Sequence, residues 1–235
     1  MRAAGPLAAT RRPSPSPLPE HRKKSELVYA YLREQILSGT YAPGQRLTLQ
    51  GLAAELSTSH MPIREAALRL ERDGLLQIAP HRDMRVTPLS PRDAHELFRI
   101  RAALEALAAR TACEHGAAAC VPAMRAANGE FAAALARGDL AAMAAANWAF
   151  HRSILAAADN LHLAQLLEDL WARCQRFRSG YKLIPGRAAA TIAEHDRIIA
   201  AMERGDPAAA DATTFRHVDA ARVDLEDLLA RRGPG

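Results

Sequence analysis

Aromatic residues, cysteines and long apolar runs are all scarce in this sequence of 235 residues. Aromatic residues make up 5% of the chain, and Ala and Leu dominate its apolar residues, so few Val and Ile remain to build β-sheet. The three cysteines form no C-x-x-C pair, which argues against a disulfide framework or a zinc ribbon and favours a reducing, cytoplasmic location. No apolar run reaches the ~20 residues of a membrane-spanning helix, so we expect no membrane partner. These shortages predict a mostly α-helical cytoplasmic protein.

Positive charge is present but unevenly distributed. The net charge is +5, of which residues 1–20 carry +2, residues 21–88 carry +3 and residues 89–235 carry none. A basic excess confined to the first third favours a polyanionic partner there, although a solvated basic surface would look the same. The first 20 residues are rich in Pro and Ser, and we expect them to be a disordered tail whose role stays open.

Residues 21–88 combine three helical patterns with two short β-prone runs. Ser25, Thr48 and Ser59 are the expected caps of the three helices. The two β-prone runs cover residues 75–78 and 84–87. Three helices and a small β-hairpin predict a winged helix-turn-helix domain.

From Pro91 onward the apolar spacing is almost purely helical. Breaks rich in Gly, Pro, Asp and Asn divide this region into about six helices. Its Ala-rich stretches carry Leu, Met, Phe and Trp at helical spacing, which is typical of close-packed helices rather than low-complexity sequence. An all-α antiparallel bundle over residues 89–232 is therefore predicted.

The start of the third helix carries the residue types that read DNA. Its first turn is polar and basic, and its later positions are apolar on one face, which suits a recognition helix inserted into a major groove. Arg64 could bond a guanine edge or a phosphate and His60 a base or a phosphate, although each alone could equally be an ordinary surface charge. The candidate DNA-binding residues are Ser57, Thr58, Ser59, His60, Met61 and Arg64 in this element, with Arg82 and Arg85 in the wing.

The run LSTSHMPIREAALRLERDGLL, residues 56–76, resembles the signature of the GntR family of transcription regulators. The upstream run YAPGQRL, residues 41–47, is similar to that family's P-G-x-x-L turn. His60 stands where the family often has Arg, and Ala67 where it often has Leu. The resemblance implies a winged helix-turn-helix that binds double-stranded operator DNA as part of a dimer, while the departures leave the operator sequence open.

The run LSPRDAHELFRIRAALE, residues 89–105, resembles the start of the FadR-like C-terminal effector domain, FCD. Arg101 and Glu105 match its R-x-x-L-E element. This resemblance implies a homodimeric regulator, which we expect to be a repressor, controlled by a small carboxylate-type metabolite. Arg101 is the candidate effector-binding residue, and a structural salt bridge with Glu105 is the alternative.

Many FCD domains bind a metal through an Asp and three His, and four positions of this chain match that pattern. They are Asn147, His151, His195 and His217. Asn147 and His151 are four residues apart, hence on one helix face, and three imidazoles from three helices could hold a divalent transition metal such as Zn²⁺ or Ni²⁺. Asn147 replaces the family's Asp, and its neutral amide oxygen is a weaker ligand that leaves the site more positive and thus more favourable to an anionic effector.

Two other functions stay open: the metal could itself be the signal, or the chain could be a metalloenzyme with a DNA-binding head. An enzyme needs a placed general base or nucleophile. Glu194 and Asp196 flank His195, but we expect them to point away from its face. Three aromatic residues are expected in the core rather than in a ligand site: Trp148, Phe150 and Trp171. The sequence therefore predicts a DNA-binding switch without catalytic residues.

Overall fold

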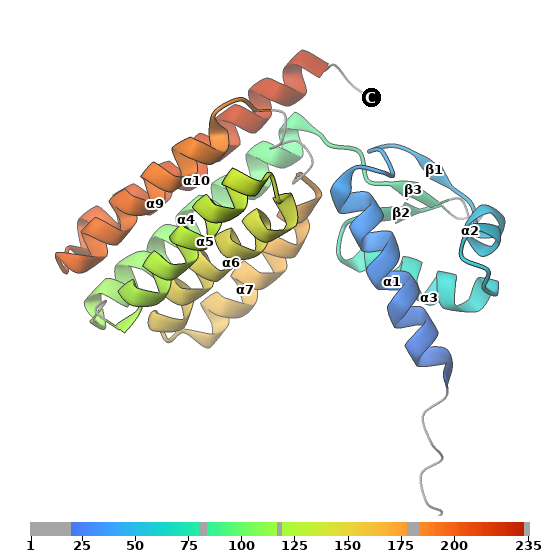
Figure 1. The fold of residues 1–235 in the computed structure, drawn as a ribbon, viewed down its shortest axis with the longest axis horizontal. Helices are drawn as coiled ribbons and strands as arrows, with labels where there is room; N and C mark the ends of the chain where they lie inside the picture. The colour runs from blue at the N-terminus through green and yellow to red at the C-terminus, as the bar shows by residue number, and fades with distance from the viewer. Residues whose placement is uncertain (1–19, 80–83, 117–118, 178–183, 233–235) are drawn as a thin grey trace, which may run out of the picture.

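The computed structural model describes residues 20–79, 84–116, 119–177 and 184–232. The chain forms a head, made of helices and a small sheet, followed by a bundle of long helices (Figure 1). This arrangement confirms the predicted mostly α-helical fold class. The predicted tail, apart from Glu20, and Arg82 of the wing lie outside the described residues.

The head contains three helices and a three-stranded antiparallel sheet. Its helices are α1 (Glu20–Ser38), α2 (Leu49–Glu55) and α3 (His60–Arg72), and its strands are β1 (Arg46–Leu47), β2 (Leu76–Ile78) and β3 (Met84–Val86). Strand β3 lies between the other two and pairs with both. The sequence thus predicted two of these three strands. It missed β1, which is too short to give a periodic signal.

Two of the three predicted N-cap residues in the head stand at the start of their helices, and the third does not. Thr48 caps α2, because its hydroxyl accepts a hydrogen bond from the Gly51 amide at 3.0 Å. Ser59 occupies the N-cap position of α3 without a side-chain hydrogen bond. The prediction that Ser25 caps the first helix is wrong, since α1 begins at Glu20 and runs through good helix formers before it reaches Ser25.

One face of α3 is buried against the rest of the head. Ile63, Ala66 and Leu70 are 0%, 1% and 0% exposed, and they share a hydrophobic core with Leu32 of α1 and Val86 of β3. Burial of this stripe holds α3 in place. The start of the helix and its opposite face remain exposed to solvent.

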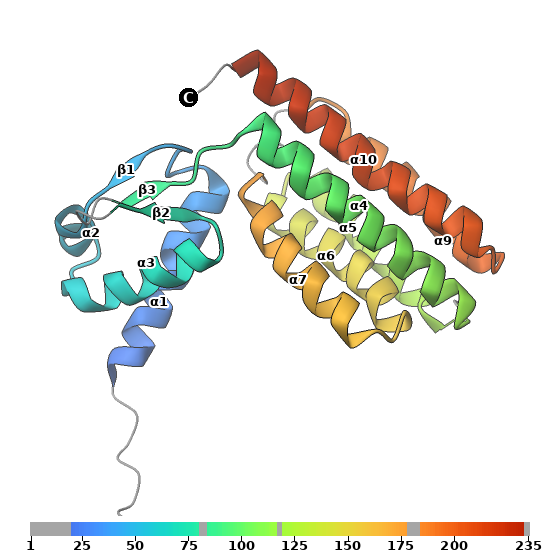
Figure 2. The same ribbon diagram turned by 180° about the vertical axis from the view of Figure 1, so that it is seen from behind.

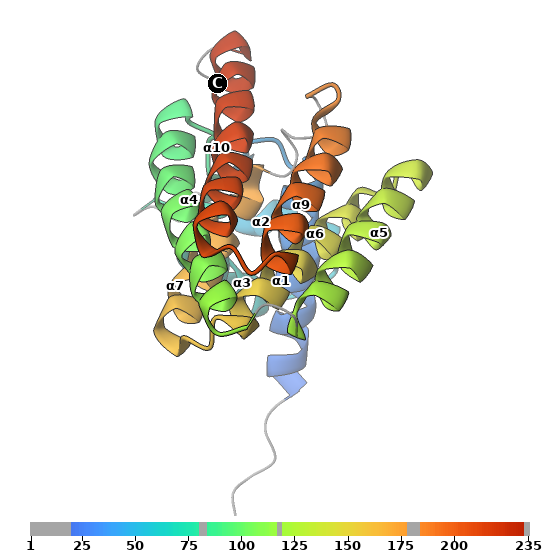
Figure 3. The same cartoon turned by 90° about the vertical axis from the view of Figure 1, so that its left-hand side faces the viewer.

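Within the described residues, six long helices and the 3₁₀ turn η2 form the bundle. They are α4 (Pro91–Glu114), α5 (Val121–Arg137), α6 (Leu140–Ala157), α7 (Leu161–Cys174), η2 (Gln175–Phe177), α9 (Arg187–Glu203) and α10 (Pro207–Arg232). Helix α10 packs on α4 and α9, and α5 packs on α6 and α9 (Figure 3). The predicted bundle of about six helices is confirmed. No helix within the described ranges is long and apolar enough to cross a membrane.

Alanine lets the bundle helices approach closely. Ala102, Ala109 and Ala112 of α4 and Ala201 of α9 are all 0% exposed. Small side chains at these contacts bring the helix backbones together, which places side chains from several helices within reach of one interior point.

The head meets the bundle where η2 lies against α1 (Figure 2). Arg33 of α1 donates a hydrogen bond to the side-chain oxygen of Gln175 in η2. The next residue of η2, Arg176, pairs with Asp93 at 2.8 Å and donates to the Gly74 carbonyl, between α3 and β2, at 3.4 Å. Residues 175 and 176 therefore connect the bundle to two places in the head.

Candidate metal centre and nucleic-acid interface

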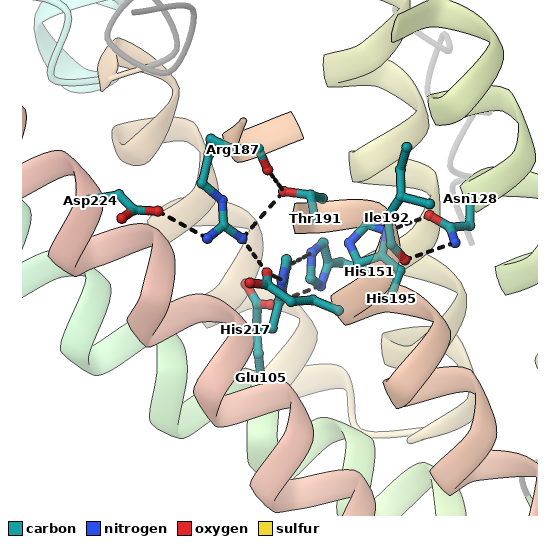
Figure 4. A network of polar contacts seen from close by, with 10 residues as sticks. Glu105, Asn128, His151, Arg187, Thr191, Ile192, His195, His217 and Asp224 are labelled. Atoms are coloured by element: carbon teal, nitrogen blue, oxygen red, sulfur yellow. Dashed lines mark hydrogen bonds and ion pairs between the residues drawn. The ribbon is translucent and has the colours of Figure 1, made fainter. Parts of the chain in front are cut away.

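Three histidines from three helices meet inside the bundle (Figure 4). His151 of α6, His195 of α9 and His217 of α10 are 4%, 0% and 4% exposed, and one ring nitrogen of each lies within 4.8 Å of those of the others. The Nε2 atoms of His151 and His217 are 3.3 Å apart. The structure thus brings together the three histidines that the sequence singled out.

An oxygen atom faces the outer nitrogen, Nδ1, of each of these three rings. Glu105 Oε2 lies 2.8 Å from Nδ1 of His151, Asn128 Oδ1 lies 3.0 Å from that of His195, and Glu194 Oε2 lies 2.7 Å from that of His217. A neutral imidazole that donates its Nδ1 proton to such an oxygen presents an acceptor lone pair on Nε2. All three Nε2 lone pairs therefore face the same interior point.

The surroundings of His195 and His217 favour the neutral form of both imidazoles. Burial, followed by the neighbouring imidazoles, lowers the pKa of His195 and of His217 well below the ordinary histidine value. Burial alone would raise the pKa of Glu105, but the Arg101 guanidinium and His151 outweigh it and hold that pKa below the ordinary glutamate range. The shifts thus favour the neutral, metal-binding form of His195 and His217 and the ionised form of Glu105.

This donor set fits a divalent transition metal. Nε2 of His195 is buried and has no hydrogen-bond partner among the described residues, which is costly for an acceptor unless a cation occupies the point it faces. Three neutral imidazoles are a common ligand set for such ions and leave coordination positions open. The residues present would hold the metal through these three nitrogens.

A cavity of about 750 Å³ adjoins the histidine cluster. Its polar wall includes His151, His217, Asn147 and the side chains of Arg101 and Arg187. The remaining wall is largely apolar and includes Phe131, Leu135, Met143, Trp148 and Trp171. Asn147 therefore lies on the same cavity wall as His151, one helical turn earlier in α6.

Arg101 forms the salt bridge that was the alternative to effector binding, and it also lies at the cavity. Its Nε donates to Glu105 Oε1 at 2.6 Å, and its side chain also lines the cavity. The same carboxylate oxygen accepts a hydrogen bond from the indole nitrogen of Trp171. Glu105 thus joins Arg101, Trp171 and His151 in one buried network.

One expectation about the neighbouring side chains is wrong. Glu194 does not point away from the cluster, because Arg187 of the same helix donates to its carboxylate and Nδ1 of His217 in α10 lies 2.7 Å from it. Phe150 and Trp171 are buried in the core as predicted, and Trp148 packs against that core. Both tryptophans also line the cavity, with ring centroids 4.4 Å apart, and Phe150 stacks on the His195 ring at 3.7 Å.

The candidate DNA-reading residues gather at one end of the head. Arg64 is half-buried beside the α3 core. Thr58 is also half-buried, and Ser57 adopts a φ of +47° in the turn between α2 and α3. Four members of the set are exposed at the start of α3 or on β3: Ser59, His60, Met61 and Arg85.

Arg85 directly faces a second arginine, Arg46, across the β1–β3 pair, and both are exposed. Two like charges directly opposite each other in a sheet are unfavourable on their own. Their pairing makes one face of the wing basic, as contact with a polyanion requires. The sequence did not single out Arg46, because the two-residue strand that aligns it with Arg85 gives no periodic signal.

Comparison with known families finds a match in each of two parts of the chain. Residues 96–220 match the FCD domain, and residues 24–86 match the family described as "Bacterial regulatory proteins, gntR family". The chain is a GntR-family regulator with an FCD domain.

Proteins similar to this GntR-family chain match it over most of its length. The "Probable D-xylose utilization operon transcriptional repressor" of Paenarthrobacter nicotinovorans is 34% identical over 196 residues, which are 82% of this chain and 84% of that protein. YdhC of Bacillus subtilis, an uncharacterized HTH-type transcriptional regulator, is 28% identical over 207 residues, 86% of this chain and 90% of its own. The structure of Escherichia coli McbR/YncC matches with a TM-score of 0.71 and 25% identity over 87% of this chain and 97% of that one. The family and these relatives are transcription regulators rather than enzymes, as predicted.

Sequence reasoning missed the residues that support the three histidines of this GntR-family chain. Asn128 of α5 holds His195 and also donates to Asp196 at 2.9 Å, and Arg187 at the start of α9 pairs with Glu194 and with Asp224 at 3.1 Å. Asn128 lies on a different helix from His195, and Arg187, although it shares α9 with His195, acts on Glu194 and Asp224, so spacing in the sequence relates neither residue to the histidines. Only Glu105 carried a signal, through its place in the R-x-x-L-E element.

Proposed function

We propose that this regulator is a homodimeric repressor whose operator affinity is set by a small carboxylate, bound in the cavity beside a divalent metal. The observation that carries this proposal is the convergence of three buried histidines, two of which line a cavity that two buried arginines also line. The name of the Paenarthrobacter relative supports the role of repressor.

The proposed DNA contacts begin at the exposed start of α3. Arg64 and His60 would reach base edges or phosphates in the major groove, and Met61 would offer an apolar contact, for example to a thymine methyl group. The hydroxyls of residues 57–59 suit phosphate oxygens. Arg85, and Arg82 in the wing, would contact the backbone or the adjacent minor groove.

The proposed effector site joins the histidine cluster to the cavity. When bound, a divalent cation would supply the positive charge that attracts an effector carboxylate. Arg101 and Arg187 add two further cationic groups, and each is held in place by carboxylates that leave part of the guanidinium facing the cavity. The tryptophans and the apolar residues of α6 would exclude water around the body of the effector.

The proposed dimer contact is an exposed apolar surface on two adjacent helices. Ile100 and Leu107 of α4 are seven residues apart, hence on one face, and are 52% and 46% exposed. Leu166 of α7, which packs on α4, is 56% exposed. A second copy of the chain would cover these side chains in a two-fold contact. Ile100→Glu/Leu107→Glu should therefore be monomeric by light scattering, whereas Val223→Glu, at an exposed apolar position on α10, should remain dimeric.

Metal analysis of the purified, untagged protein tests the effector site. We expect about one transition metal per chain in the wild type, and none in His151→Ala/His195→Ala. His162→Ala removes an exposed histidine of α7 and should keep the metal. If no metal is retained even after Zn²⁺ or Ni²⁺ is added, the metal part of the proposal fails.

An operator-binding assay separates the proposed signal from its alternative. The operator can be selected by the protein from random DNA, and a set of carboxylates then added at fixed metal concentration. We expect a carboxylate to change operator affinity only in protein with an intact histidine cluster. If the metal alone produces the full change and no carboxylate adds to it, the metal is the signal and the carboxylate role is excluded.

A further inference from the structure

The wall of the effector cavity contains one residue from the DNA-binding head. Arg33 lies on α1, yet it lines the same cavity as two arginines and two histidines of the bundle: Arg101, Arg187, His151 and His217. It reaches that wall at the junction where α1 meets η2. The cavity is therefore not enclosed by the bundle alone, and its contents can contact the head directly.

Arg33 differs from the other arginines near the cavity in the chemistry of its hydrogen-bond partner. Arg101 pairs with Glu105, Arg187 with Glu194 and Asp224, and Arg176 of η2 with Asp93. Arg33 instead donates to the neutral side chain of Gln175, and no carboxylate among the described residues forms an ion pair with it. A guanidinium that faces a neutral amide can gain a stronger, charge-assisted bond from an anion.

We infer that Arg33 forms a second anion-binding subsite of the effector cavity. This subsite would select ligands with two acidic groups and link their binding to the DNA-binding head. This inference rests on the proposed function, because the first acidic group is assigned to the histidine cluster and its metal. The second acidic group, at the other end of the ligand, would displace Gln175 from Arg33. A monocarboxylate cannot occupy both places.

The 3₁₀ turn η2 gives this exchange a mechanical consequence. Cys174 and Gln175 line the cavity, and the adjacent Arg176 contacts the Gly74 carbonyl where α3 ends. A ligand that takes Arg33 away from Gln175 changes the contact between η2 and α1, and η2 also touches the end of α3. Effector binding can then shift operator affinity, because the ligand makes different contacts in the two arrangements of the head.

The test compares diacids with monoacids of the same carbon number. The probes are the straight-chain dicarboxylates from succinate to suberate, phthalate, and the matched monocarboxylates from butanoate to octanoate with benzoate. Each is titrated by calorimetry into Zn²⁺-loaded wild-type protein. We expect at least one diacid to bind about tenfold more tightly than its monoacid, the gain of one charge-assisted contact.

Three variants assign that preference to Arg33. Arg33→Gln should reduce the diacid preference to below about threefold, and Arg33→Lys, which keeps the charge, should restore part of it. Lys24→Gln removes the same charge from an exposed position of α1 and should leave the preference unchanged. In the operator assay, the same diacid should change DNA affinity in the wild type but not in Arg33→Gln.

The outcomes separate this inference from the proposed function. Equal binding of diacids and monoacids overturns the inference alone, as does a diacid preference that survives Arg33→Gln or that Lys24→Gln removes equally. If no carboxylate of either kind binds the metal-loaded protein, both the inference and the proposed effector class fail. In a further outcome, diacids and monoacids both bind, with affinities that His151→Ala abolishes and Arg33→Gln leaves unchanged. That result supports the proposed function and rejects the second subsite.

Discussion

Nε2 of His217 lies 3.3 Å from Nε2 of His151, and the two nitrogens face each other as lone pairs whenever both rings carry their protons on Nδ1, the atoms that lie 2.7 and 2.8 Å from the Glu194 and Glu105 carboxylates. If one ring shifted its proton to Nε2, its Nδ1 lone pair would instead face an ionised carboxylate, which is unfavourable. The carboxylates therefore fix two lone pairs against each other. A cation between them removes that repulsion, so the centre is more stable filled than empty.

Metal removal should make the stability of the protein depend on pH in a defined direction. Burial lowers the pKa of His195 and His217 in the folded state, so below the ordinary value of about 6.5 the unfolded chain binds protons that the folded chain does not. Stability that is fully present above this value is therefore lost as the pH falls through it. Each histidine contributes a slope of up to about 1.4 kcal/mol per pH unit.

Chelator-treated protein should show this slope in urea unfolding between pH 7.5 and 5.5, and His195→Phe should show a smaller one. Metal-loaded protein should be more stable across the same range, because bound metal competes with protons for the same nitrogens. A flat profile for the metal-free wild type would contradict the neutral state assigned to these two rings.

Glu194→Ala should weaken metal binding although Glu194 is not one of the proposed ligands. It removes the acceptor that orients His217, and loss of such support costs about 10- to 100-fold in metal affinity. Competition with a chromophoric chelator measures the change. Glu168→Ala, which removes an exposed partner of Arg152, is the matched control and should have wild-type affinity.

Asn147→Asp should move metal affinity and effector affinity in opposite directions. A carboxylate is a stronger ligand than an amide oxygen, so the metal should bind more tightly. The added negative charge on the cavity wall should weaken binding of an anionic effector. Parallel titrations with Zn²⁺ and with the carboxylate chosen from the operator assay measure both. If neither affinity changes, Asn147 lies on the cavity wall without contacting metal or effector.

Most of the architecture could be predicted from the sequence, because local signals encode it. The stripe through Ile63, Ala66 and Leu70 placed α3, and glycine, proline and capping residues placed the breaks of the bundle. The exception in the head was β1, whose pairing with β3 arises from tertiary contacts rather than from a pattern in two residues.

The site was only half predictable, for a physical reason. The three histidines were found through the family resemblance. Their supports come from helices distant in sequence: Asn128 is 67 residues from His195, and Glu105 contacts Trp171 across 66 residues. Polar residues of these types are common on helix surfaces, so nothing local distinguishes the buried ones. Only the packed bundle makes Glu194 and Arg187 part of the centre.

Arg64→Ala should strongly weaken operator binding and leave the dimer intact. Arg64 follows the exposed first turn of α3, where a side chain can reach a base edge, and loss of one such contact costs about 1–3 kcal/mol. Fluorescence anisotropy with a labelled operator measures affinity, and light scattering measures the dimer. Arg92→Ala, on the exposed start of α4, should bind normally. Normal binding by Arg64→Ala would refute the assignment of α3 as the recognition helix.

Arg85→Thr should separate DNA affinity from stability in the wing. Threonine suits a strand, and the change removes a positive charge that directly faces Arg46, so the free energy of unfolding should stay the same or rise by up to about 1 kcal/mol. If Arg85 contacts a phosphate, operator affinity should fall, and the slope of log affinity against log salt should become shallower by about 0.9. A loss of affinity with an unchanged salt slope would instead show that Arg85 reads a base, because only the phosphate contact releases a counterion in proportion. Unchanged affinity would remove Arg85, and with it the Arg46–Arg85 face, from the DNA interface.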